Sequence, residues 1–404
     1  MNIPTYIERP YYTKKITPFL EKQIIKVLTG QRRVGKSYIL FQLMDSILAK
    51  NSNANIIYIN CELEQFFSIK NHDDLLLYVK QNIKHGRENY LFIDEIQEIE
   101  SFELALRSLF AENICDIICT GSNANMLSGE LATYLSGRYI EFNIHSLSYK
   151  EFLQFHKLQK SPESAVKFLQ YGGMPYLVQI GLTDQMPFEY LRNVYATILL
   201  RDVVSRENIR NVAFLENLIQ YIAGNIGNLF SANNISRYLK SQRVSMSPQL
   251  VINYLKALTN AFFIHKALRT NIEGLKIFEI GEKYYFEDLG LRNALWGHSQ
   301  KMDNNQLLEN AVFLHLMQQD FKVFVGQLGT QEIDFVAEKN GVRVYVQVCL
   351  QLSNEKTINR EFGNLLMIKD NFPKYVVSLN DTLIGNNYKG IIHLNLHDFL
   401  MLEL

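Results

Sequence analysis

The sequence predicts an α/β protein in which a helix-covered parallel β-sheet precedes a helical segment and a smaller α/β domain. Between residues 24 and 144, short β-branched runs alternate with stretches of helical period, which is the pattern of βα repeats. After residue 146 helical stretches dominate, and strand signals return only beyond residue 262. The 404 residues exceed what one core of about 300 residues holds, so we expect domains at 1–146, 147–297 and 298–404.

Composition excludes several classes of protein. The 41 Lys and Arg balance the 41 Asp and Glu, so any contact with nucleic acid must come from a local patch. The four cysteines lack CxxC spacing, which indicates a reducing compartment. No run approaches the ~18 apolar residues of a membrane span, and the N-terminus lacks a secretory signal. We therefore expect a cytoplasmic protein without a membrane partner.

The first 144 residues show the βα pattern most clearly. Five strands are expected, at 24–28, 55–60, 90–93, 114–120 and 139–144. Between the first two, apolar residues from Ile39 to Leu48 recur at three- and four-residue steps. That spacing predicts an amphipathic helix over 36–49 with one buried stripe.

A phosphate-binding motif, GxxxxGK[ST], lies between the first expected strand and this helix. Its glycines allow backbone N–H groups to surround phosphate oxygens, Lys36 reaches the β- and γ-phosphates, and the Ser37 hydroxyl binds Mg²⁺. The motif therefore predicts a P-loop NTPase with ATP and Mg²⁺ as cofactors. The expected nucleotide-binding residues are Gly30, Gln31, Arg32, Arg33, Val34, Gly35, Lys36, Ser37 and Tyr38.

Two adjacent carboxylates end the third expected strand, LFIDE. Asp94 is expected to hold the Mg²⁺ shell together with Ser37, and Glu95 to orient or deprotonate the attacking water. A surface turn is the alternative for an isolated Asp-Glu pair, but the phosphate loop makes it a weak one.

Three further polar residues are candidates for catalysis. Ser122 and Asn123 follow the fourth expected strand, where they can sense the γ-phosphate or the water; a helix N-cap at Ser122 carries nearly equal weight. Arg138 precedes the fifth strand and is expected either to stabilise transition-state charge, in cis or across a subunit boundary, or to be a solvated surface residue.

Several motifs together carry a family resemblance: the phosphate loop, LFIDEIQ, CTGSNANML, LSGRYIEF, YGGMPYL and KYYFEDLGLRNAL. In their order and spacing the chain resembles prokaryotic AAA-type ATPases that carry a C-terminal domain of unknown function with a restriction-endonuclease-like core. The resemblance covers nearly the whole chain. It implies an ATP-binding domain, a helical lid with a winged-helix segment, and a nuclease-like tail.

Residues 233–280 read as helix, turn, helix and two short strands, 262–268 and 275–280, the order of a winged helix. Its second helix carries one Lys among apolar neighbours, which is weak equipment for reading a DNA groove. We therefore rank DNA binding slightly below packing against a protein or another domain as the role of this segment. The basic residues that can form a phosphate-contacting patch are Arg237, Lys240, Arg243, Lys266 and Arg269.

The tail holds a second, weaker candidate metal site. Glu309 lies on an expected helix, Asp334 on one strand, and Gln347 on the next, a spacing used by restriction-like nucleases. Cys349 stands where such a site has a lysine, and it is a poor substitute for an ammonium. We favour a retained fold without cleavage; Lys339 or Lys356 can supply the missing charge in the nuclease alternative.

The sequence as a whole predicts an ATP-binding, slowly hydrolysing AAA-type protein whose nucleotide state acts as a switch on its C-terminal domains. The alternatives are a nucleotide-gated DNA nuclease, and a DNA-binding or scaffold protein without significant turnover. A protein partner and an oligomer are compatible with either reading.

Overall fold

A computed structural model of the chain describes residues 3–124, 135–183, 185–241, 246–274, 281–296, 304–352, 354–379 and 387–404. The chain forms two compact units. We call them the N-terminal unit, which ends at His145 and also takes in Asn260–Phe262, and the C-terminal unit, which comprises Ser146–Thr259 and Phe263–Leu404.

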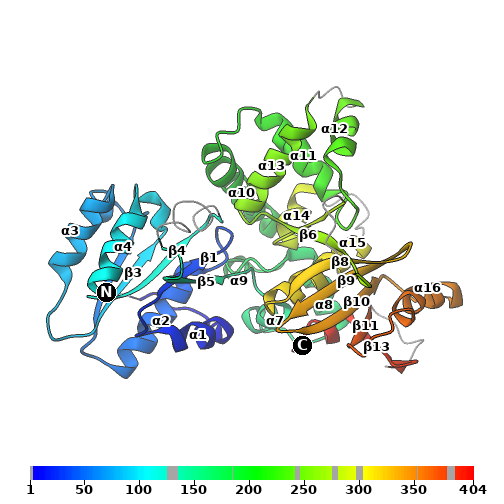
Figure 1. Ribbon diagram of the computed structural model, residues 1–404, viewed down its shortest axis with the longest axis horizontal. Helices are drawn as coiled ribbons and strands as arrows, with labels where there is room; N and C mark the ends of the chain where they lie inside the picture. Colours follow the sequence, from blue (N-terminus) through cyan, green and yellow to red (C-terminus); the bar gives the residue numbers. More distant parts are fainter. Residues whose placement is uncertain are drawn as a thin grey trace. The chain divides into compact units, whose positions relative to one another are not determined.

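The N-terminal unit is built on a five-stranded parallel sheet in the order β2-β3-β4-β1-β5 (Figure 1). All five predicted strands are confirmed to within two residues at each end. Their bounds are β1 Ile25–Thr29, β2 Asn55–Asn60, β3 Asn89–Asp94, β4 Asp116–Gly121 and β5 Tyr139–Asn143. The central strand β1 is buried along its whole length, as expected for a parallel sheet covered on both faces.

Helices cover both faces of this sheet. Leu75 and Val79 of α3, with Ala105, Leu106 and Leu109 of α4, pack in one core against the strands. Helix α2 confirms the predicted amphipathic helix, burying Ile39, Leu40, Leu43, Met44 and Ile47. The helices are α1 Pro10–Ile16, α2 Lys36–Lys50, α3 His72–Asn82 and α4 Phe102–Glu112.

The C-terminal unit begins with a series of helices, as the sequence predicts. Ser148 and Glu151 form a capping box at the start of the first one, which fixes where that helix begins. The α-helices are α7 Tyr149–His156, α8 Pro162–Tyr171, α9 Leu177–Ile180, α10 Met186–Thr197, α11 Val212–Ala223, α12 Ala232–Ser241, α13 Pro248–Asn260 and α14 Leu289–Trp296, and a π-helical stretch, η4 Ile198–Ser205, continues α10.

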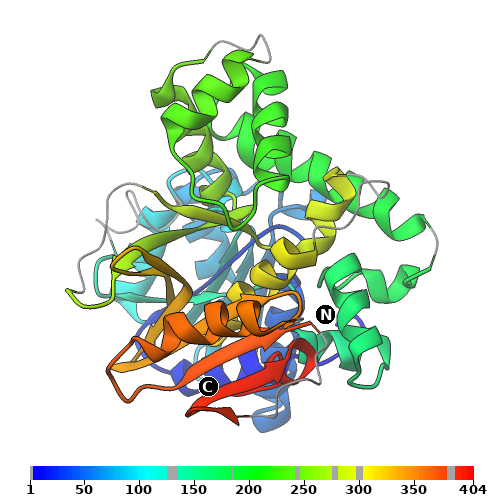
Figure 2. The same cartoon turned by 90° about the vertical axis from the view of Figure 1, so that its right-hand side faces the viewer.

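A second sheet of eight strands, in the order β12-β13-β11-β10-β9-β8-β6-β7, forms the rest of this unit. Strands β8, β9 and β10 form an antiparallel meander, and β11 joins β10 in parallel. Helix α16 packs against one core of this sheet and is the orange helix in Figure 2. The elements are β6 Ile264–Asn271, β7 Lys283–Phe286, α15 Asn304–Gln318, β8 Lys322–Leu328, β9 Gln331–Lys339, β10 Val342–Cys349, α16 Glu355–Leu366, β11 Lys374–Ser378, β12 Asn387–Tyr388, β13 Ile391–Asn395 and α17 Leu396–Phe399.

The strands expected as a wing belong to this larger sheet. Strand β6 pairs antiparallel with β7 and parallel with β8, from Leu268 opposite Phe324 to Asn271 opposite Gln327. The expected second wing strand, 275–280, lies outside the described residues; the partner of β6 is β7. Backbone hydrogen bonds thus run from the hairpin into the tail, across the boundary expected near residue 298.

Two motifs that carried the family resemblance meet backbone to backbone. Gly172 has φ +72°, and a Cβ there would lie 2.4 Å from the Gly290 nitrogen. The Asp288 carboxylate accepts hydrogen bonds from the N–H groups of Gly173 at 2.7 Å and Leu291 at 2.9 Å. Burial raises the pKa of Asp288 to about 7. YGGMPYL and FEDLGLRNAL are therefore halves of one packing contact.

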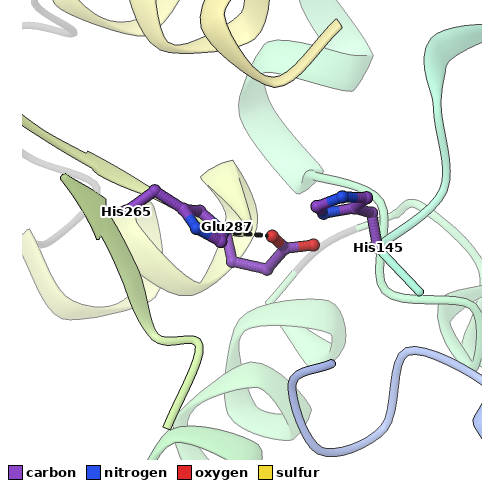
Figure 3. Close-up of side chains that lie close together, drawn as sticks. All are labelled: His145, His265 and Glu287. Carbon is purple, nitrogen blue, oxygen red and sulfur yellow. Dashed lines mark hydrogen bonds and ion pairs between the residues drawn. The ribbon is translucent and has the colours of Figure 1, made fainter. Parts of the chain in front are cut away.

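The neighbouring Glu287 ties the start of the C-terminal unit to the same place. It accepts a hydrogen bond from the Ser146 N–H at 2.8 Å, and its other oxygen lies 2.5 Å from His265 Nε2 (Figure 3). The glutamate is 1% exposed, so both contacts are shielded from water.

In the described part of the chain, every helix is too short or too polar to cross a bilayer.

Candidate functional site: a phosphate loop at the edge of the parallel sheet

The topology of the first sheet brings the phosphate loop, the Asp94-Glu95 pair and Ser122 to one edge. The phosphate loop follows the carboxyl end of β1, Asp94 ends β3, and Ser122 follows β4. Strand β4 lies between β1 and β3, and all three run in parallel. The carboxyl ends of parallel strands meet at the same edge, so the loop and both carboxylates share one site.

Glycine is required at two places in the loop. Gly30 has φ +142°, and a Cβ there would lie 2.1 Å from the carbonyl oxygen of Ile144, just beyond β5. Gly35 has φ +97° and is the N-cap of α2. The first-turn N–H groups of a helix have no partner within that helix. The loop therefore combines close backbone packing on one side with a helix N-terminus suited to anions.

Lys36 lies at the centre of the site. Its Nζ donates hydrogen bonds to the carbonyl oxygens of Gly30 and Gln31, both at 3.0 Å, and lies 3.8 Å from Oε1 of Glu95. The side chain is nearly fully buried. The ammonium is thus held between two loop carbonyls and the Glu95 carboxylate.

The Thr120 side chain links the Asp94 carboxylate to the backbone of Glu95. Its hydroxyl donates to Oδ1 of Asp94 at 2.6 Å and accepts the Glu95 N–H at 2.9 Å. Asp94 also has a side-chain hydrogen bond with Ser37. Ser37 and Asp94 are therefore placed together as an oxygen-ligand pair of the kind Mg²⁺ prefers.

The two carboxylates differ in electrostatics. Burial raises the pKa of Asp94, although hydrogen bonds from Thr120 and Ser37 oppose the rise. Burial also favours the neutral form of Glu95, but the charges of Lys36 and Arg32 outweigh it and leave the pKa of Glu95 below its ordinary value. Glu95 is thus a carboxylate at neutral pH, the state that a general base needs.

The remaining predicted residues divide between the site and its surroundings. Ser122 is fully buried and donates to Oε2 of Glu95 at 3.1 Å. Asn123 follows it, half-buried. Arg32 is buried and pairs with Glu62 at 2.9 Å, whereas Arg33 and Tyr38 are exposed. Ser122 therefore holds the Glu95 carboxylate in place.

Arg138 does not reach this site within its own chain. Its carbonyl accepts the N–H of Ile25 at the start of β1, and its guanidinium lies over the Phe110 ring at 5.6 Å. The phosphate loop follows the other end of β1, so the strand length separates them. The expectation of a role in cis is corrected; a role across a subunit boundary stays a prediction.

Sequence reasoning missed two side chains that support Glu95. Thr120 is buried inside a strand and resembles any core threonine in sequence. Gln97 donates to Oε2 of Glu95 at 2.5 Å from a 3₁₀ turn, Ile96–Glu98, that begins with Glu95 at φ +58°. Gln97 has a local signal, its closeness to the DE pair, whereas Thr120 lies 25 positions from Glu95 and has none.

A second cluster lies in the C-terminal unit. Glu309 on α15, Asp334 on β9 and Gln347 on β10, the predicted weak site, line one cavity of about 620 Å³. The Asp334 N–H lies 3.4 Å from the Gln347 side-chain oxygen, and Asp334 accepts the Val348 N–H at 2.7 Å. Cys349, Arg360 and Glu361 line the same cavity. The structure therefore gathers the three predicted residues.

A lysine that sequence reasoning missed enters this cluster from β7. Lys283 Nζ lies 3.1 Å from Glu309 and 2.9 Å from Glu332, and its side chain is 2% exposed. Burial lowers the pKa of Lys283, but Glu309, Asp334 and Glu332 outweigh it and raise the pKa above the ordinary value. Burial and the charge of Glu309 raise the pKa of Asp334 well above its usual range, against the pull of Lys283.

The predicted basic patch is spread over two elements. Arg237 and Lys240 are exposed on α12, and Lys266 is exposed on β6. Arg269, also on β6, donates to Gln327 at 2.6 Å, and Arg243 lies outside the described residues. A continuous phosphate-binding surface stays a prediction.

Comparison with known proteins places these sites in a family. Residues 22–153 match the family described as "AAA domain", and residues 162–302 match a "Domain of unknown function (DUF8612)". An uncharacterized protein of Haemophilus influenzae is 35% identical over 92% of this chain and 93% of its own length. The uncharacterized protein MJ1544 of Methanocaldococcus jannaschii is 31% identical over 83% and 77%.

The chain belongs to the same family as these two proteins. Its N-terminal unit carries an AAA-type P-loop domain, which makes it an ATP-binding protein of the AAA type. Two solved structures are similar at low identity. The Aeropyrum pernix ORC1 protein in complex with DNA is 11% identical, with TM-score 0.34, over 72% of this chain and 93% of that one. AMPPCP-bound DnaA from Aquifex aeolicus is 15% identical, with TM-score 0.31, over 63% and 89%.

Proposed function

We propose that the chain hydrolyses ATP slowly in the N-terminal unit and uses its nucleotide state as a switch on the C-terminal unit. The observation that carries the proposal is the convergence of Lys36, Asp94 and Glu95 at one sheet edge, with Glu95 kept ionised. A site that only bound nucleotide would need the loop and the lysine but no oriented, charged glutamate.

The residues present fit ATP and Mg²⁺. The Ser37 hydroxyl and the Asp94 carboxylate, joined by a hydrogen bond, are the oxygen ligands that would hold the cation. When bound, Mg²⁺ neutralises phosphate charge. Lys36 would exchange its bonds to two loop carbonyls for bonds to phosphate oxygens. The loop N–H groups orient the phosphates.

Glu95 is proposed as the general base. Its carboxylate accepts a proton from water as the water oxygen attacks the γ-phosphorus and the bond to the ADP oxygen breaks. Ser122 and Gln97 both donate to Oε2 of Glu95, and Lys36 lies beside Oε1. The side chain is therefore held from several directions, so its position does not depend on the nucleotide.

Glu95→Gln tests this function. Glutamine keeps the size and an acceptor oxygen but cannot take the proton, so turnover measured by phosphate release should fall ~100-fold or more while ATP affinity is retained. Glu100→Gln is the matched control, because Glu100 is an exposed glutamate that follows the same 3₁₀ turn, and its turnover should equal that of the wild type. Equal turnover in Glu95→Gln would remove the base from this position.

The C-terminal cavity carries the alternative function. The tail runs in the order α15, β8, β9, β10, α16 and β11, and it gathers Glu309, Asp334 and Gln347 at one cavity. Lys283 brings an ammonium to that cluster. These features support a nucleotide-gated nuclease as the alternative to a fold retained without cleavage.

The retained fold is the proposal we favour, because Lys283 is already bonded to two carboxylates and Cys349 offers no positive charge. Purified protein should leave plasmid and linear DNA intact with Mg²⁺ or Mn²⁺, with or without ATP. Metal-dependent cleavage that disappears in Asp334→Ala would establish the nuclease instead. DNA binding that weakens steeply with salt, without ATP turnover, would support the scaffold alternative.

A further inference from the structure

The phosphate loop has an outer side whose hydrogen bonds need partners. When a loop turns its N–H groups towards an anion, its carbonyl groups face away from the anion and require donors of their own. Lys36 serves the carbonyls of Gly30 and Gln31. The carbonyl of Val34, next to Gly35, is served by a residue from outside the motif: Nη1 of Arg9 donates to it at 2.9 Å.

Burial and two contacts fix the position of Arg9. Its side chain is almost fully buried, and its guanidinium lies 4.6 Å from the centre of the Tyr12 ring. Its backbone N–H donates to the side-chain oxygen of Gln42 on α2 at 2.9 Å. The residue is therefore fixed at the start of α1, against the helix that follows the loop.

The same guanidinium also binds the strand end on which the loop packs. Nη2 of Arg9 donates to the carbonyl of His145 at 3.1 Å, and the His145 N–H donates to the Tyr12 hydroxyl at 3.0 Å. One residue earlier, Ile144 donates its N–H to Thr29 at 2.7 Å, and its carbonyl abuts Gly30. Arg9 thus connects the loop carbonyl to its packing support.

We infer that Arg9 is a positioning residue for nucleotide binding, one that acts through the backbone of the phosphate loop. The inference rests on the proposed function of the same loop. By holding the Val34 carbonyl outward, Arg9 keeps the adjoining N–H groups turned towards the phosphates before ATP arrives, and its buried charge adds positive potential behind the loop. The sequence motif contains no sign of it, since Arg9 precedes Gly30 by 21 positions.

The test is ATP-Mg²⁺ titration and steady-state turnover of the full chain carrying Arg9→Gln. Loss of a charge-assisted bond to the loop should raise the ATP Kd and KM by about tenfold. At saturating ATP, kcat should stay within about twofold, because Glu95, Ser122 and Gln97 are untouched. A merely structural role would instead lower the active fraction, and with it kcat, while leaving the Kd of the folded molecules unchanged.

Two further variants keep the inference open to refutation. Arg292 is an equally buried arginine that donates to a backbone carbonyl, that of Ala223, in the C-terminal unit. Arg292→Gln should lower the unfolding midpoint and leave the ATP Kd unchanged. Arg9→Lys, which can serve one of the two carbonyls, should give a Kd between those of wild type and Arg9→Gln, and it decides the matter if Arg9→Gln does not fold.

The outcomes separate the inference from the function on which it rests. Wild-type protein that does not bind ATP-Mg²⁺ would contradict the proposed function. Wild type that binds, with Arg9→Gln or a folded Arg9→Lys binding equally well, would overturn the role of Arg9 and leave the proposed function standing. A parallel rise in Kd for Arg292→Gln would also overturn it, because the effect would then reflect general destabilisation.

Discussion

The N-terminal and C-terminal units each bury a lysine among carboxylates, and the two lysines are held differently. Lys36 bonds to two neutral loop carbonyls and has one carboxylate, Glu95, at 3.8 Å. Lys283 has two carboxylates, Glu309 and Glu332, at 3.1 and 2.9 Å. An ammonium bonded to neutral groups forms stronger bonds when it exchanges them for phosphate oxygens, whereas one already paired with two carboxylates gains little interaction energy from that exchange. We therefore propose that Lys36 binds a ligand and that Lys283 stabilises the fold.

The largest expected effect is on stability. Lys283→Met should lower the free energy of unfolding by about 3 kcal/mol, because it leaves Glu309 buried without its cation. Lys36→Met should cost about 1 kcal/mol, since it removes two bonds to carbonyls and one more distant contact with a carboxylate, Glu95 at 3.8 Å. Urea unfolding measures both, and Trp296, the single tryptophan, reports on the C-terminal unit. Equal losses would break the comparison.

Glycines beside each lysine site sharpen the distinction. Gly30→Ala places a methyl group 2.1 Å from the Ile144 carbonyl, so the loop must move and ATP affinity should fall by about tenfold or more. Gly227, at φ +74°, lies against Glu309: an added Cβ would be 2.6 Å from its Oε2. Gly227→Ala should cost about 1–2 kcal/mol of stability and leave ATP affinity unchanged. ATP titration and urea unfolding of both variants check this, and a reversed pattern would contradict it.

The sequence predicts the residues of a site when they are neighbours along the chain, and it misses those that only tertiary packing brings together. The phosphate loop and the DE pair are local, because eight consecutive residues set the loop and a strand end sets the carboxylates. Arg9, Thr120 and Lys283 reach their sites only through tertiary packing. Arg9 lies 21 positions before Gly30, and Lys283 lies 49 positions before Glu332. No periodicity encodes such meetings.

The fold shows the same limit. The five parallel strands follow from β-branched runs, whereas the pairing of β6 with β8 does not, because it joins residues far apart in the sequence, such as Leu268 and Phe324. Arg138 illustrates the converse: it directly precedes β5, and in a parallel sheet the residues before a strand lie at the edge opposite the phosphate loop.

The smallest expected effect is a gain at the C-terminal cavity. Cys349 is buried at its wall, where an ammonium would meet Asp334 and Gln347. Cys349→Lys should give slow metal-dependent nicking of plasmid DNA, abolished by adding Asp334→Ala, if the cavity retains a nuclease geometry that lacks only charge. Agarose gel assays with Mg²⁺ and Mn²⁺ detect it. The absence of nicking would mark the cavity as packing alone.

We expect ATP to bind through Lys36 and not at Lys283, the buried lysine of the other unit. Calorimetric titration with ATP-Mg²⁺ of wild type, Lys36→Ala and a folded Lys283 variant tests it most directly. We predict one binding event in wild type, the same affinity in the Lys283 variant, and no measurable binding in Lys36→Ala. Binding by Lys36→Ala with an affinity near that of the wild type would contradict the account.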